Sequence, residues 1–159
     1  MGNDSGKVLV VYSGGLDSTV LLHKLAAQSR VAGAIGFLYG QRHSKELDFA
    51  QKNCSKLNID FYLADISALS PMFGNNSLTD RDVEVPEGKY YESNMKSTVV
   101  PNRNMIMLSL AAARAIAVGA QAVAYAAHSG DHAIYPDCRP EFTEAMERAL
   151  ALCHYYPIG

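Results

Sequence analysis

The chain has 159 residues, the length of one domain. Fourteen basic and sixteen acidic side chains give a formal net charge of −2 without any run of like charge, which argues against a surface for nucleic acids or anionic membranes. A hydrophobic content of 48% excludes a disordered or collagen-like chain. We therefore predict a single globular domain over residues 1–159 that binds neither nucleic acid nor membrane directly.

The cysteines and the first residues bear on the cellular compartment. Cys54, Cys138 and Cys153 are an odd number without C-x-x-C spacing, and residues 1–7 contain no apolar signal core. These features predict a protein of the reducing cytoplasm. Residues 105–117 form the most apolar helical stretch, but it is too short to span a bilayer and contains Arg114, so we expect no transmembrane segment.

Short apolar runs alternate along the chain with longer amphipathic segments, the pattern of parallel strands joined by crossover helices. The predicted strands are residues 7–12, 32–38, 60–64 and 122–126. The predicted helices are residues 17–27, 44–57, 103–118 and 140–152, where Gly119 ends the third and Pro140 begins the fourth. Residues 66–99 have no sustained periodicity and are too long for an ordinary connection, which indicates a substrate or lid loop. The predicted fold is an α/β, doubly wound parallel sheet of the Rossmann-like, three-layer α/β/α type.

The segment Ser13-Gly14-Gly15-Leu16-Asp17-Ser18 joins the first predicted strand to the first predicted helix. Two glycines let backbone N–H groups approach an anion, the two serines add hydroxyl donors, and the helix start supplies the positive end of its dipole. The Walker spacing is absent and no lysine follows the glycines. We therefore predict a pyrophosphate cradle of another kind. The alternative is a glycine-rich turn in which Asp17 or Ser18 merely caps the helix.

Polar residues follow each predicted strand, at the edge where open α/β sheets bind their ligands. After the glycine turn come residues 39–43, Asp65 and residues 128–132, and we expect all four places to converge on one crevice. His43, His128 and His132 lack the spacing of a known zinc site, and Cys138 fits a packed thiol better than a nucleophile.

Two arginines stand at predicted helix starts, where the helix dipole disfavours a cation. Arg103 and Arg139 therefore indicate an anionic ligand nearby, which guanidinium groups bind in bidentate fashion. A salt bridge to a local acid such as Glu141 or Asp137 is an equally open alternative. Asp131 and Asp137 lie near the same place, although aspartates in turns most often bond their own backbone.

Four blocks of sequence together resemble one family. They are residues 13–18, residues 39–43 with Glu46, residues 100–104, and residues 128–142 with the sequence YPDCRP at 135–140. The chain resembles the 7-cyano-7-deazaguanine synthases, nitrile-forming ligases of the queuosine pathway, from Val8 to about Leu150. The first block alone marks only the ATP-pyrophosphatase superfamily, whereas the last is far more specific. The resemblance implies an adenine-nucleotide alpha-hydrolase-like fold.

It also implies a two-stage use of ATP. The carboxylate of 7-carboxy-7-deazaguanine is activated, ammonia forms the amide, and the amide oxygen is activated in turn and expelled as the nitrile forms. The residues that would bind ATP are Tyr12, Ser13, Gly14, Gly15, Leu16, Asp17, Ser18 and Thr19, with Mg²⁺ on Asp17. The residues that would bind the substrate are Tyr39, Gln41, Arg42, Asn102, Arg103, His128, Asp131, Asp137 and Arg139. The residues expected to be catalytic are Asp17, Arg103, Asp131 and Arg139.

One departure from the family concerns zinc. Members carry a four-cysteine zinc site further along the chain, and this sequence ends at Gly159 without it, so no zinc ligands are expected here. The chain is then either a shortened form with an incomplete site or a natural variant that works without the metal, and a homodimer is left open. An inactive ATP-binding module is the main alternative. A tRNA-thiolating enzyme fits less well, because a sulfur-handling cysteine pair and a basic RNA surface are both absent.

Overall fold

The computed structural model describes residues 6–40, 45–73, 102–127 and 135–153. Within them, one parallel sheet has the strand order β3-β2-β1-β4. The strands are β1 (Val8–Val11), β2 (Val31–Leu38), β3 (Phe61–Asp65) and β4 (Ala122–Ala124). The α-helices are α1 (Leu16–Ala27), α2 (Lys45–Lys56), α4 (Arg103–Ala117) and α5 (Pro140–Leu152). None of these helices is long and apolar enough to cross a membrane.

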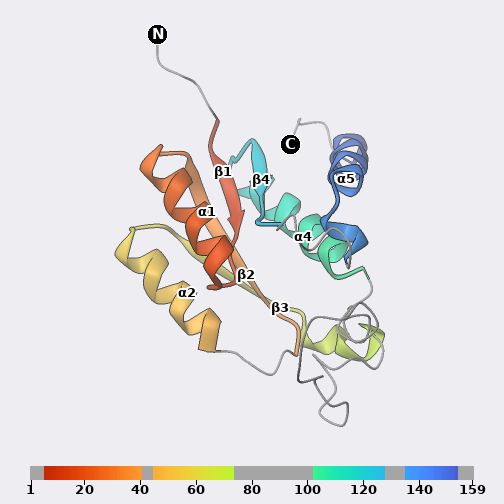
Figure 1. The fold of residues 1–159 in the computed structure, drawn as a ribbon, viewed down its shortest axis with the longest axis horizontal. Coiled ribbons are helices and arrows are strands. Elements are labelled where there is room, and N and C mark those ends of the chain that lie inside the picture. The colour runs from red at the N-terminus through yellow and green to blue at the C-terminus, as the bar shows by residue number, and fades with distance from the viewer. Residues whose placement is uncertain (1–5, 41–44, 74–101, 128–134, 154–159) are drawn as a thin grey trace, which may run out of the picture.

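Helices cover both faces of the sheet, α1 and α2 on one side and α4 and α5 on the other (Figure 1). Alternate residues of β1 point to opposite faces, as the pleat requires. Val8 and Val10 join the core against α1, whereas Leu9 joins the core against α4, where it packs with Met107 and Ala111. The fold is therefore the predicted doubly wound α/β sheet.

The predicted elements agree with the structure to within one or two residues. Gly119 ends α4 as predicted, because its φ of +71° allows the Ala120 N–H to bond the Ala115 carbonyl at 2.8 Å, the closing bond of a Schellman motif. The prediction was wrong about the end of β4, which was expected to run to residue 126. Pairing with β1 stops at Ala124, and the next two residues line a cavity instead.

Two short 3₁₀ helices among the described residues were not predicted. The first, η1 (Ser67–Phe73), begins the long segment 66–99, and the second, η4 (Pro136–Cys138), precedes α5. The Asp65 carboxylate accepts the Ser67 N–H at 3.0 Å and starts η1. The Ser67 hydroxyl donates a second hydrogen bond to the same carboxylate oxygen. Both bonds, that of the hydroxyl more strongly, hold the pKa of Asp65 below its usual value. Most of the predicted lid loop lies outside the described residues.

Candidate functional site

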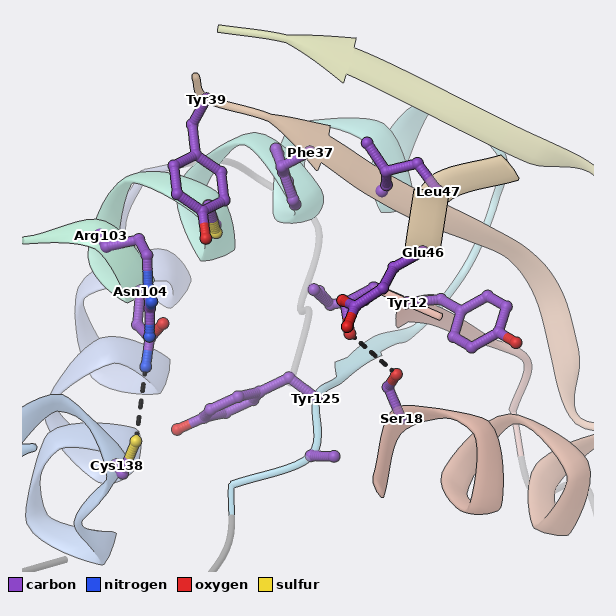
Figure 2. Close-up of a pocket in the computed structure, with 15 residues that line it drawn as sticks. Tyr12, Ser18, Phe37, Tyr39, Glu46, Leu47, Arg103, Asn104, Tyr125 and Cys138 are labelled. Atoms are coloured by element: carbon purple, nitrogen blue, oxygen red, sulfur yellow. Dashed lines mark hydrogen bonds between the residues drawn. The ribbon is translucent and has the colours of Figure 1, made fainter. Parts of the chain in front are cut away.

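A cavity of about 340 Å³ opens where β1, β2 and β4 end (Figure 2). This volume is at the lower end of the range of about 300 to 1,000 Å³ for small-molecule sites. The glycine turn and the start of α2 form one wall, and the start of α4 with η4 forms another. The cavity lies at the edge of the sheet where the sequence predicts a ligand.

The glycine turn is closed by hydroxyl groups that bond one another. The Gly15 N–H donates to the Ser13 Oγ at 3.2 Å, and the Ser18 Oγ donates to the Gly15 carbonyl at 3.1 Å. The two serine oxygens lie 3.1 Å apart. Because Ser18 gives its only hydroxyl hydrogen to Gly15, the hydrogen between the serines comes from Ser13. The turn thus uses both hydroxyl donors that the sequence analysis assigns to a ligand.

A second series of hydrogen bonds connects the turn to α1 and α2. The Asn53 side chain of α2 donates to the Tyr12 hydroxyl at 2.9 Å, and this hydroxyl lies 3.1 Å from the Thr19 Oγ1. Thr19 in turn donates to the Gly15 carbonyl at 2.8 Å. Tyr12 is fully buried, so its ring serves to join α1 to α2 beneath the turn.

The backbone N–H groups at the start of α1 are available to a ligand. Gly15 is the N-cap and makes no side-chain capping bond. The N–H groups of the first helical turn, residues 16–18, have no partner within the helix. They point along the helix dipole toward the end of the turn, an arrangement that binds anions such as phosphate.

The two glycines of the turn differ in whether the fold requires glycine at their position. Gly14 has a φ of +87°, and a Cβ atom on it would lie 2.2 Å from the main-chain oxygen of Glu46. Gly15 has a φ of −72° and a ψ of 168°, which any residue adopts. A Cβ there would come no closer than 3.3 Å, to the Ser13 hydroxyl. Gly14 is therefore required by the packing of α2 against the turn, whereas Gly15 is not required by the fold.

Glu46 brings a carboxylate to this wall. It is the second residue of α2 and its side chain is directed into the cavity, toward the side on which Ser18 lies (Figure 2). Among the described residues that line the cavity, no other is a carboxylic acid. The sequence analysis quotes Glu46 within a motif but gives it no role.

The opposite wall is organised around Asn104, the second residue of α4. Its main-chain N–H donates to the Asp137 carboxylate at 3.3 Å, and its side-chain amide donates to the Asp137 carbonyl at 3.2 Å. The same amide lies 3.6 Å from the buried Cys138 sulfur. Asp137 therefore caps the start of α4 from η4 and offsets the dipole beside Arg103, which lines the cavity.

Tyr125 is a residue of the cavity that the sequence analysis missed. Its hydroxyl lies 3.0 Å from the Thr143 Oγ1 of α5. Burial raises the pKa of Tyr125, an effect that the Thr143 hydrogen bond partly opposes. No signal for it was available in the sequence, because the predicted strand ran to residue 126 and so placed Tyr125 inside it, whereas β4 ends at Ala124 and leaves Tyr125 at the edge where ligands bind.

The structure brings together some of the predicted site residues. Those that line the cavity are Tyr12, Ser13, Ser18, Tyr39 and Arg103. The predicted residues that do not line it are Gly14, Gly15, Leu16, Asp17, Thr19, Asn102, Asp137 and Arg139. Gln41, Arg42, His128 and Asp131 lie outside the described residues. The expectation that Asp65 reaches the crevice was wrong, because its carboxylate caps η1.

No group of three or more potential metal ligands occurs within the described part of the chain. Cys54 and Cys138 are buried and Cys153 is exposed, and none of the three forms a disulfide. Burial raises the pKa of the Cys54 thiol to about 11, so this thiol is unreactive at neutral pH. Cys138 is the packed thiol that the sequence predicts.

Comparison with known proteins decides the family. The model of the family described as queuosine biosynthesis protein QueC matches residues 7–158. The chain belongs to this family. It is 53% identical to the 7-cyano-7-deazaguanine synthase of Hahella chejuensis over 96% of its own length and 65% of the relative, and 51% identical to that of Alteromonas mediterranea over 97% and 70%. The chain thus spans about two thirds of the length of these relatives.

A solved structure supports the fold. The chain is similar to the glutamine-dependent NAD⁺ synthetase of Acinetobacter baumannii, solved with ADP, with a TM-score of 0.50 and 14% identity over 96% of this chain and 30% of the synthetase. At this identity the likeness concerns the fold alone, which is the adenine-nucleotide alpha-hydrolase fold.

Proposed function

We propose that this chain converts 7-carboxy-7-deazaguanine and ammonia to 7-cyano-7-deazaguanine with ATP. Membership of a family whose relatives carry that name supports the reaction. The observation that carries the proposal to this chain is the uncapped start of α1 beside the cavity, because it offers backbone donors for a phosphate group.

The nucleotide is assigned to the glycine turn. The N–H groups of residues 16–18 would bind the phosphates, and Asp17 would hold Mg²⁺ there. Asp17 fits that ion because it is exposed, lies in the first turn of α1, and supplies the oxygen ligands that Mg²⁺ prefers. When bound, Mg²⁺ would neutralise the phosphate charge.

The deazapurine acid is assigned to the wall that Tyr39 and Arg103 form. Tyr39 offers a ring for a flat bicyclic substrate, and the Arg103 guanidinium offers paired donors for a carboxylate. Figure 2 shows both side chains on the same side of the cavity, across from Ser18. This arrangement would place the carboxylate between the ring site and the phosphates, where activation takes place. Gln41, Arg42, His128 and Asp131 remain predicted contacts, and Arg139 remains a predicted contact although it does not line the cavity.

A product assay tests the proposal. The folded chain is incubated with 7-carboxy-7-deazaguanine, ATP, Mg²⁺ and ammonia, and the products are identified by mass spectrometry. We expect first the amide and then the nitrile, with nucleotide consumed in both stages. The absence of both products from folded protein would contradict the proposal. Calorimetric ATP binding without nucleotide consumption would instead identify a binding module.

A further inference from the structure

We propose that Glu46 is the general base that takes the protons from nitrogen as ammonia becomes the amide and the amide becomes the nitrile. The proposal rests on the function proposed above. Its structural basis is that Glu46 brings the one carboxylate that lines the cavity, among the described residues, to the wall formed by the glycine turn.

The position of Glu46 is fixed by its main chain. Its carbonyl oxygen lies so close to Gly14 that no Cβ atom fits between them, so the start of α2 rests directly on the turn. From there the side chain enters the cavity on the side of Ser18 (Figure 2). A base at this place stands beside the phosphates and therefore beside the leaving group that they form.

The chemistry of both stages requires a proton acceptor there. In the first, the ammonia lone pair forms a C–N bond to the activated carboxyl carbon, the nitrogen loses a proton to Glu46, and the C–O bond to the phosphate breaks to leave the amide. In the second, the amide oxygen is bonded to phosphorus, the nitrogen loses its protons, and their electron pairs complete the C≡N bond as the C–O bond breaks. Glu46 passes each proton to water, and nothing is oxidised or reduced.

The other titratable groups of the cavity are poorer bases. Tyr39 and Tyr125 carry phenols, whose hydroxyl groups bring a hydrogen to donate, and Arg103 carries a guanidinium, which has no acceptor atom, whereas a carboxylate offers two acceptor oxygens. Burial shifts the pKa of Tyr125 further in the protonated direction. The Cys138 thiol is buried beside the Asn104 amide.

Asp48 provides a matched control for a purely structural role of Glu46. An acidic residue in the first turn of a helix stabilises the helix dipole, typically by about 0.3 to 1 kcal/mol. Asp48 occupies the same first turn of α2 and is exposed like Glu46, but it does not line the cavity. If Glu46 acts only on the helix, Glu46→Gln and Asp48→Asn will have the same effects.

The experiment separates activation from proton transfer. Exchange of labelled pyrophosphate into ATP, or of labelled ADP if activation transfers a single phosphoryl group, reports activation alone when it depends on the deazapurine acid and ammonia is absent. For Glu46→Gln we expect exchange within about threefold of the wild-type rate and a fall in amide and nitrile formation of about 100-fold or more. Asp48→Asn is expected to change neither.

Other results of the two assays would overturn the proposal. Loss of exchange together with product formation would overturn the proposal, because Glu46 would then serve nucleotide or metal binding. An unchanged product rate would overturn it directly. If Glu46→Gln fails to fold, Glu46→Asp keeps the test, with retained exchange and slowed product formation expected. A wild-type chain with neither exchange nor products would refute the proposed function, and this proposal with it.

Discussion

The two walls of the cavity are held in different ways. The glycine turn is fixed by main-chain contact with α2 and by hydroxyl groups that bond one another, beneath which Tyr12 is fully buried. The wall across from it depends on separate side-chain contacts, Asn104 with Asp137 and Tyr125 with Thr143. The first wall is thus rigid and, at Gly14, intolerant of an added Cβ atom, whereas the second can be altered one contact at a time.

The largest expected effect is at Gly14. In Gly14→Ala, strain at a φ of +87° and a Cβ atom 2.2 Å from the Glu46 oxygen should together lower the free energy of unfolding by about 3 kcal/mol or more. Urea denaturation followed by circular dichroism measures this loss. A stability near that of the wild type would mean that α2 does not rest on the turn.

Gly15→Ala tests phosphate binding by the glycine turn separately from the stability of the fold. Its backbone angles are ordinary and its Cβ would meet only the Ser13 hydroxyl, so we expect the free energy of unfolding to change by less than about 1 kcal/mol. The added methyl group should nevertheless weaken ATP binding several-fold in calorimetry, because it stands at the uncapped start of α1. Unchanged affinity would argue against the turn as the phosphate site.

The capping contact of the opposite wall is expected to contribute less. Asp137→Ala should lower the free energy of unfolding by about 1 to 2 kcal/mol, because the Asn104 N–H at the start of α4 loses its charged acceptor. Urea denaturation of Asp137→Ala and of Asn104→Ala, which keeps the main-chain N–H, measures the two contacts separately. An unchanged free energy of unfolding in Asp137→Ala would show that the cap does not stabilise the wall.

A similar but smaller loss is expected at Tyr125. Tyr125→Phe keeps the ring and removes the hydrogen bond to Thr143, which should lower the free energy of unfolding by about 1 kcal/mol. Thr143→Val is the matched change on α5. If the bond accounts for both losses, the double variant will be no less stable than either single variant.

The free energy of unfolding at alkaline pH tests the burial of the Cys54 thiol of α2. The pKa of Cys54 is about 11 in the folded state against 9.0 for an ordinary thiol, because of burial. Above about pH 9 the unfolded chain therefore loses the proton first and the free energy of unfolding falls, by less than about 1 kcal/mol near pH 9.5. Urea unfolding of the wild type and Cys54→Ala at about pH 8 and pH 9.5 measures it. A constant difference between them would contradict this pKa.

The fold was largely predictable because each element has a local signal. Apolar runs and amphipathic periods located the strands and helices, and Gly119 and Pro140 marked two helix boundaries. The 3₁₀ helix η1 was missed because its signal, the Asp65 carboxylate accepting a hydrogen bond from the Ser67 main chain, was taken as part of a ligand crevice.

The site was predictable only in part. The sequence identified the glycine turn, Tyr39 and Arg103, but it cannot distinguish Glu46 from Asp48, two acids in one helical turn, because only the contact with Gly14 places one of them at the cavity. Asp137 likewise looks like any aspartate in a turn, since its partner Asn104 lies 33 residues earlier.

The direction of the hydrogen bonds in the glycine turn bears on how tightly a ligand is held. A phosphate that recruited the Ser13 hydroxyl would take its hydrogen away from Ser18, so one bond would be lost for each one formed. That serine therefore adds little net affinity. The attraction has to come from peptide groups that have no competing acceptor, which makes the cradle sensitive to backbone geometry and tolerant of side-chain loss at Ser13.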